Sequence, residues 1–263
     1  MEKMNKIKDE FGRLVEIMEK LRSDDGCPWD REQTHQSLRQ FLLEETYEVL
    51  ETIDEENYDE LKYELGDLLL QVIFHAQIAQ ENRMFDIGDV LKAISDKLIH
   101  RHPNVFGDVQ IKSAEEQIVN WEKMKHSEGK KSVIDGVPKE LSALLRAHRI
   151  QSKAATVGFD WETIIQVWDK VKEELAEFET AIESKNQAEI EDEFGDILFT
   201  LVNLSRFINV NPEDAMRATT EKFIKRFKLV EQEIKKQGKL VSESSLDELD
   251  AIWDRIKVAA NNK

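Results

Sequence analysis

The sequence contains few of the residues that stabilise small secreted or membrane proteins. Its 263 residues include one cysteine, four prolines and ten glycines. Because Cys27 has no partner cysteine, it cannot form an internal disulfide, which fits a reducing compartment. No apolar run is long enough to cross a membrane, and the N-terminus has no signal-peptide pattern. We therefore expect a cytoplasmic protein.

Several common chemical motifs are also absent. The sequence has neither a GxxxxGK[ST] nor a GxGxxG loop, and its six histidines show no zinc-binding spacing. A ferritin-like di-iron site would need Glu-x-x-His, which the acidic motifs lack. No segment alternates between apolar and polar residues as a strand would. Low Gly and Pro, with abundant Glu, Lys, Leu, Ile and Ala, favours helices, so we predict an all-α fold.

The net charge is strongly negative. The chain has 54 acidic and 37 basic residues, which gives a formal charge of −17. This charge argues against a nucleic acid polymer as a partner, because the phosphate backbone would be repelled. It leaves room for a small anionic ligand, since a bound metal ion or a local cluster of Lys and Arg can reverse the field locally.

Helical periodicity divides the first half into amphipathic segments. It predicts helices over 4–22, 33–54 and 58–82, with Asn57 as an N-cap, and a further helix that Asp86 caps. The apolar residues of the third helix define its predicted core face, and these are Leu61, Leu65, Leu68, Leu69, Val72 and Ile73.

A polar, glycine-containing segment separates two halves of similar order. We place the domain boundary at 127–137, between a helical domain over 1–130 and a second over 137–263. A chain of this length is sufficient for two medium-sized domains.

The second half contains acidic residues at helical spacing. Glu174 and Glu177 are three apart, as are Glu193 and Asp196, so each pair projects from one helix face. Asn186, in the polar break between the pairs, is a predicted N-cap. Two antiparallel helices joined there would bring four carboxylates together. Such a cluster needs cations, and oxygen ligands favour a hard divalent ion, Mg²⁺ first.

The same acidic pattern occurs 129 positions earlier in the chain, as Glu45, Glu48, Glu64 and Asp67. One such pattern alone is usually a solvated helix face. A second copy in the same register is not expected from a high acidic content alone. We therefore predict a tandem duplication of one helical unit.

A glycine accompanies each copy of the acidic motif. Gly66 and Gly195 stand directly before the aspartates and are also 129 positions apart. A glycine inside a helix costs about 1 kcal/mol relative to alanine. We therefore expect another helix to pack closely against both positions.

Cations and a tryptophan follow the acids in each half. Lys222 and Arg226 share a helix face, as do Lys97 and Arg101. The planar Arg fork and the mobile Lys ammonium both suit phosphate, although such a pair alone more often bridges nearby glutamates. Trp253 lies late on an amphipathic helix. That position is typical of a core or interface residue, and a nucleobase could stack on the ring instead.

These motifs together resemble one known family. The pairs EETYE/ELGD and EELAE/EFGD, with GCPWD, ISDKLIHRHPNVF and VGFDW, resemble the MazG family of all-α nucleoside triphosphate pyrophosphohydrolases over nearly the whole chain. The resemblance implies Mg²⁺-dependent hydrolysis of nucleoside triphosphates, ATP among them, to monophosphate and pyrophosphate. It also implies a homodimer.

The resemblance assigns roles to particular residues. The metal-binding and catalytic acids would be Glu174, Glu177, Glu193 and Asp196. The nucleotide-contacting residues would be Lys170, Lys222, Arg226 and Trp253, with Glu174 and Asp196 beside them. One position departs from the pattern, because some relatives carry a lysine where this chain has Glu189.

The C-terminal copy has cations that the N-terminal copy lacks. Lys170 and Lys172 precede the second acidic motif, whereas Phe41 and Leu43 stand at the matching positions of the first. A triphosphate would meet less counter-charge in the first copy. We therefore expect Glu45, Glu48, Glu64 and Asp67 to form a second, weaker metal set, in a domain with little or no activity.

Two other functions remain open from the sequence. A non-catalytic acidic helical module that dimerises or senses nucleotide would explain the charge, but not the repeat of the acids in register. A narrow dUTPase or dCTPase is the alternative within enzymes. Stacking on one tryptophan without defined base-edge donors favours broad base tolerance.

Overall fold

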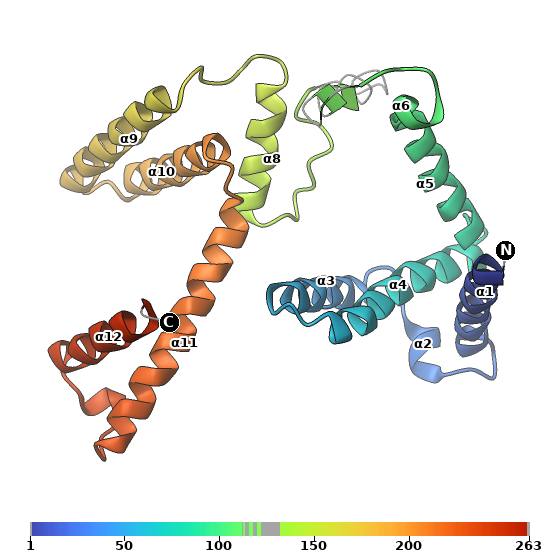
Figure 1. Cartoon of the computed structure of the whole chain (residues 1–263), viewed down its shortest axis with the longest axis horizontal. Coiled ribbons are helices and arrows are strands. Elements are labelled where there is room, and N and C mark those ends of the chain that lie inside the picture. The colour runs from blue at the N-terminus through green and yellow to red at the C-terminus, as the bar shows by residue number, and fades with distance from the viewer. Residues whose placement is uncertain (1, 112, 114–115, 118–119, 122–131, 262–263) are drawn as a thin grey trace. The chain divides into compact units, whose positions relative to one another are not determined.

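The computed structural model describes residues 2–111, 113, 116–117, 120–121 and 132–261 (Figure 1). The chain divides into two compact units, Met1–Ile111 and Lys112–Lys263. The described residues contain helices and no strand, which confirms the prediction of an all-α fold. Residues 127–131 of the predicted boundary segment 127–137 lie outside the described residues.

The first unit is built around a pair of long helices joined by a short turn. Its elements are α1 (Glu2–Arg22), α2 (Pro28–Glu32), α3 (Arg39–Asp54), α4 (Tyr58–Glu81), α5 (Ile87–Arg101) and α6 (Pro103–Phe106). Helices α3 and α4 form a hairpin, and α1 packs against α4. The predicted caps are confirmed, because Asn57 accepts from the Glu60 N–H at 3.3 Å and Asp86 forms a capping box with Asp89.

The core of the first unit lies where α1 meets α4. Met18, Leu38, Ile73, Phe74 and Ile78 are buried together there. Arg22 closes this contact: its Nη2 atom lies 2.7 Å from Glu81 Oε2, and its guanidinium lies 5.4 Å from the centre of the Phe74 ring. The side chain of Arg22 is only 7% exposed and that of Glu81 is 36% exposed, so this charge-assisted pair links the two helices at the edge of the core.

Helix α3 begins later than predicted. The sequence predicts a helix from residue 33, but α3 starts at Arg39. Thr34 and Ser37 exchange hydrogen bonds between side-chain hydroxyls and backbone N–H groups, at 2.9 and 3.1 Å. These local bonds give the backbone an alternative to the helix, which is why the turn replaces its first residues.

The second unit repeats the hairpin and adds a long helix. Its elements are α8 (Ala143–Ala155), α9 (Ile164–Ser184), α10 (Gln187–Phe207), α11 (Pro212–Lys236), the short 3₁₀ helix η1 (Val241–Glu243) and α12 (Leu246–Asn261). Lys185 ends α9 in the left-handed region, at φ 58°. Asn186 then caps α10 by accepting from the Ala188 N–H at 3.2 Å, as predicted. The turn between the two acidic helices is therefore two residues long.

Helix α8 packs against both α10 and α11. Gln151 Nε2 donates to the Phe199 carbonyl at 2.8 Å, and Ser142 Oγ donates to Glu213 Oε2 at 2.6 Å. Helix α11 continues to α12, where Val230, Ile234 and Ile252 form a separate buried cluster. In Figure 1, α11 leads away from the α9–α10 pair.

Two sequence-based expectations about α4 and α10 are wrong. A Cβ atom placed on Gly66 or Gly195 would meet nothing within 4 Å, so no helix in the described part of the chain packs closely there. The predicted core face of α4 is only partly buried. Leu65, Leu69 and Val72 are 48%, 38% and 41% exposed, because α4 meets α1 near its C-terminal end and leaves this stripe uncovered.

Among the described residues, no helix combines the length and the apolar character that a membrane span requires.

Candidate metal and nucleotide site

Three glutamates of the second unit converge between α9 and α10. One carboxylate oxygen from each of Glu174, Glu177 and Glu193 lies within 4.8 Å of the others. Glu174 continues the buried stripe of α9, because it follows Val167 and Val171 at spacings of seven and three residues. It is only 5% exposed, whereas Glu177 is exposed and Glu193 half-buried. The cluster thus extends from a buried carboxylate to the surface.

The acids of this cluster influence one another. Burial, followed by the neighbouring carboxylates Glu177 and Asp196, raises the pKa of Glu193 above its ordinary value. Asp196 is therefore close enough to act on Glu193, although the group of oxygens within 4.8 Å does not include it. Concentrated negative charge of this kind favours a bound cation.

A lysine on the preceding turn of α9 pairs with the buried acid. Lys170 Nζ lies 2.9 Å from Glu174 Oε1 and 2.7 Å from Glu173 Oε1. These bonds, to Glu173 and then Glu174, raise the pKa of Lys170, so it is charged at any physiological pH. Sequence reasoning identified Lys170 as a cation near the site but missed this pairing. The signal was present in the four-residue spacing of Lys170 and Glu174.

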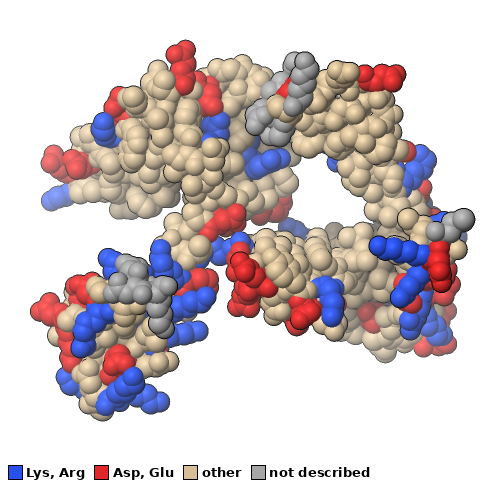
Figure 2. All heavy atoms as spheres, viewed as in Figure 1, with Lys and Arg blue, Asp and Glu red and all other residues tan. Residues whose placement is uncertain are grey.

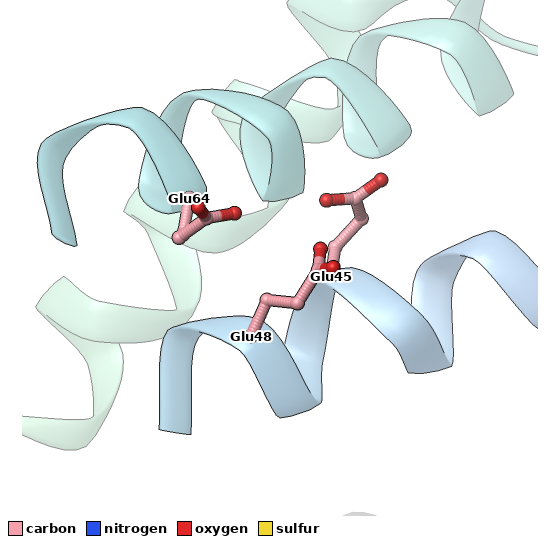
Figure 3. A group of neighbouring side chains, drawn as sticks. All are labelled: Glu45, Glu48 and Glu64. Atoms are coloured by element: carbon pink, nitrogen blue, oxygen red, sulfur yellow. The ribbon is translucent and has the colours of Figure 1, made fainter. Parts of the chain in front are cut away.

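The first unit contains a matching cluster. Glu45 and Glu48 extend from α3 toward Glu64 on α4, and their nearest oxygens also lie within 4.8 Å of one another (Figure 3). Burial, followed by Asp67 and Glu48, raises the pKa of Glu45. Burial, followed by Glu48 and Asp67, likewise raises the pKa of Glu64. The two hairpins therefore each gather three equivalent glutamates, although Glu45 is half-buried where Glu174 is buried.

The position that matches Lys170 differs in the first unit. Phe41 stands there and packs against the apolar core, with its ring edge-on to Trp29 at a centroid distance of 5.6 Å. The first cluster therefore has an aromatic ring where the second has an ammonium group.

The structure does not bring the other predicted phosphate-binding residues to the acids of the same chain. Lys222 and Arg226 lie on α11, which packs against α8, η1 and α12. The Arg226 guanidinium lies 6.0 Å from the centre of the Trp253 ring. Trp253 itself is half-buried and packs against Phe223, at a centroid distance of 5.1 Å. In a single chain, Trp253 is a core residue with a cation above its ring.

Glu189 occupies the position where some relatives have lysine. It accepts hydrogen bonds from Ser184 Oγ at 2.9 Å and from Asn186 Nδ2 at 2.8 Å. In this chain the position therefore stabilises the turn between α9 and α10.

The fold and the site together define a class of protein. The chain is all-helical, and each of its two units contains a hairpin with three glutamates gathered between the helices. The profile of the MazG nucleotide pyrophosphohydrolase domain matches it twice, over residues 33–106 and 162–230. These segments contain the two hairpins, which confirms the predicted tandem duplication. The chain belongs to the MazG nucleotide pyrophosphohydrolase family.

Three relatives each align over nearly the whole of this chain. The nucleoside triphosphate pyrophosphohydrolase/pyrophosphatase MazG of Thermotoga maritima is 50% identical over 94% of this chain and 95% of its own length. The nucleoside triphosphate pyrophosphohydrolase of Escherichia coli K12 is 43% identical over 95% and 97%. The uncharacterized protein YabN of Bacillus subtilis is 46% identical over 94% of this chain, which spans 52% of that protein.

Proposed function

We propose that this chain hydrolyses nucleoside triphosphates to nucleoside monophosphate and pyrophosphate at the α9–α10 cluster, with Mg²⁺ as cofactor. The observation that carries the proposal is the convergence of Glu174, Glu177 and Glu193 to within 4.8 Å, in a chain whose full-length relatives are named for this activity. A non-catalytic helical module would not need two such clusters in register.

The donor set suits the cofactor. Carboxylate oxygens are the ligands that Mg²⁺ prefers, and this ion commonly uses a few carboxylates together with substrate phosphates. Glu174, Glu177 and Glu193 would hold it, with Asp196 beside them. When bound, the ion would neutralise charge on the phosphate oxygens and lower the pKa of a coordinated water.

The reaction that follows is a displacement at the α-phosphorus. A glutamate of the cluster orients a water molecule and accepts its proton while the water oxygen bonds to the α-phosphorus. The bond between the α-phosphorus and the bridging oxygen breaks, and pyrophosphate leaves with the electron pair. Lys170, near the acids, and Lys222 and Arg226, on α11, stabilise the negative charge of the leaving group.

The active form in this proposal is a homodimer. Phe194, Leu198 and Leu201 form an exposed stripe on α10, at 51%, 39% and 42% exposure. Figure 2 shows a broad area without Lys, Arg, Asp or Glu within the α8–α10 part of the molecule. Exposed apolar residues gathered on one helix face often mark an interaction site. A second copy whose α11 lay against this region would also bring Lys222 and Arg226 toward the carboxylates.

We propose broad base tolerance for the nucleotide. Trp253 would offer a ring face to the base once Arg226 turns toward the phosphates, and every base can stack on a ring face. Comparable kcat/KM values across a panel of nucleoside triphosphates and deoxynucleoside triphosphates would support this. A preference of several hundredfold for dUTP or dCTP would indicate a narrow house-cleaning enzyme instead.

Product analysis tests the reaction itself. Phosphorus NMR of ATP incubated with the chain and Mg²⁺ should show AMP and pyrophosphate appearing together, and reaction in ¹⁸O-labelled water should place the label in AMP. Orthophosphate as the first product, or label in pyrophosphate, would contradict attack at the α-phosphorus. Absence of turnover with every nucleotide and divalent metal would favour a non-catalytic module.

A further inference from the structure

Glu174 is the deepest acid of the second cluster, and its charge has one close cationic partner in the part of the chain that the structure describes. Its side chain is 6% exposed, and Lys170 Nζ lies 2.9 Å from its Oε1 atom. A buried carboxylate is costly unless it is paired with a cation or coordinates a metal ion. In the metal-free chain, the Lys170 ammonium fulfils that requirement.

The same carboxylate belongs to the group that gathers Glu174, Glu177 and Glu193 within 4.8 Å. A divalent ion bound by this group must compete with Lys170 for the Glu174 carboxylate. Lys170 can leave, because its ammonium sits on a flexible stem and its side chain is 30% exposed. Its second partner, Glu173, is 56% exposed, so that ion pair is screened by solvent and holds the ammonium weakly.

The first unit provides a comparison within the same chain, because its cluster of acids lacks the lysine. Its cluster of Glu45, Glu48 and Glu64 also has ligand oxygens within 4.8 Å of one another, but Phe41 replaces the lysine and packs into the apolar core. The first cluster thus offers its acids to a metal ion without an internal competitor, whereas the second has a built-in one.

We propose that Lys170 is a displaceable internal cation that couples metal binding to nucleotide binding at the second cluster. It neutralises Glu174 while the site is without metal, which weakens binding of a free divalent ion. When an ion takes Glu174, the freed ammonium becomes available to a phosphate oxygen, so metal and triphosphate each strengthen the binding of the other. This inference rests on the proposed function, because it assumes that both ligands bind at this cluster.

Thermodynamic linkage makes the proposal measurable. If the nucleotide tightens metal binding by a given factor, the metal must tighten nucleotide binding by the same factor. Couplings of this kind are typically about 5- to 150-fold. Replacement of Lys170 by an uncharged residue removes the cation that competes with the metal ion for Glu174. It should therefore tighten metal binding in the absence of nucleotide and reduce the coupling factor.

The experiment uses the full chain with Glu48→Gln and Glu64→Gln, so that the metal signal comes from the second cluster. Binding of Mn²⁺, as a spectroscopic substitute for Mg²⁺, is titrated by electron paramagnetic resonance, with and without a triphosphate whose α–β bridge is a methylene group. Lys170→Gln is compared with Lys170→Arg, which keeps the charge. The matched control is Lys172→Gln, which removes the same charge from the same helix but breaks only a pair with Asp169 at 3.0 Å.

We expect Lys170→Gln to lower the Kd of Mn²⁺ without nucleotide by roughly tenfold, and to reduce the nucleotide-induced change in Kd by a similar factor, which leaves the coupling from direct contact between metal and phosphate. Lys170→Arg and Lys172→Gln should keep values near those of the parent chain. If Lys170 only stabilised the fold, Lys170→Gln would lower the melting temperature equally with and without Mn²⁺. The proposal instead requires the melting temperature that Lys170→Gln loses to be largely recovered when Mn²⁺ is added.

One contrary result is that Lys170→Gln and Lys172→Gln bind Mn²⁺ with equal affinity, in a chain that still binds metal and hydrolyses nucleotide. That result would overturn the proposed role of Lys170 and leave the proposed function standing. Absence of Mn²⁺ binding to the parent chain, both with and without nucleotide, would overturn this inference together with the proposed function.

Discussion

At the scale of single residues, two identical acidic patterns acquire different properties from one neighbour. Glu45 and Glu174 hold equivalent positions, yet Phe41 lies one turn before the first and Lys170 one turn before the second. The sequence predicted this asymmetry from the missing cations of the first copy. It did not predict that Lys170 binds Glu174, because the four-residue spacing allows such a pair without requiring it.

The first prediction compares the two copies by substitution. Glu177→Gln or Glu193→Gln should reduce hydrolysis of ATP by at least about 100-fold, since each removes a charged ligand from the proposed site. The matched change of Glu48 and Glu64 to Gln should leave most of the activity. Steady-state rates with Mg²⁺ measure both, and circular dichroism checks folding. The opposite ranking would assign catalysis to the first unit.

The second prediction concerns how pH affects metal-dependent stability. Burial and neighbouring acids raise the pKa of Glu45, Glu64 and Glu193. Their folded forms therefore bind protons more readily than the unfolded chain, and their repulsion lowers stability as pH rises above about 4.5. A metal ion relieves that repulsion only where the acids are ionised. The rise in melting temperature on addition of Mg²⁺ should be larger at pH 7.5 than at pH 5, as scanning calorimetry would record. A rise that does not depend on pH would mean that the metal binds elsewhere.

At the scale of helices, boundaries were predicted well at three helices that a side chain caps. Asn57, Asp86 and Asn186 accept bonds from the first turns of their helices, and these contacts depend only on neighbouring residues. The start of α3 and the exposure of the α4 stripe were predicted wrongly. The start of α3 was missed because Thr34 and Ser37 form local hydrogen bonds that replace the helix. The exposure of the α4 stripe was missed because periodicity does not specify what packs against a helix.

The third prediction concerns the turn before α3. His35 Nδ1 and His75 Nδ1 lie 2.8 Å apart and share one hydrogen bond, which joins this turn to α4. Burial, and then His35, lowers the pKa of His75. The unfolded chain therefore binds this proton more readily, so the contribution of the pair is present at neutral pH and is lost as pH falls below about 6.5.

Hydrogen exchange of the peptides that cover 33–41 and 71–81 measures this loss. Their protection should fall between pH 7.5 and 5.5, after correction for the intrinsic rate, and His75→Gln should reduce that dependence. His148→Gln is the control, because it changes a half-buried histidine of the other unit. The same pH dependence in wild type and His75→Gln would exclude the histidine pair as its cause.

At the scale of the whole molecule, the duplication extends to the surfaces. Leu65, Leu69 and Val72 of α4 stand 129 positions before Phe194, Leu198 and Leu201 of α10, and all six are more than a third exposed. Each set has the spacing of a core face. In each unit, the helices that pack against the hairpin leave this set exposed. The cations of α11 are likewise separate from the acids of the same chain. Both observations favour assembly of two copies.

The fourth prediction tests that assembly. Leu198→Glu should convert a dimer of two 30.6 kDa chains to a monomer, as light scattering after gel filtration would show. Burial of one leucine contributes about 2 kcal/mol, and symmetry makes each substitution act in both copies, so an ionised glutamate at this position should be sufficient to separate them. Leu246→Glu is the control, because Leu246 lies at the start of α12 and is 79% exposed. If neither change alters the mass of a dimer, the α10 stripe does not form the interface. If the unchanged chain is already a monomer, Lys222 and Arg226 would need a rearrangement of α11 to reach a triphosphate at the carboxylates.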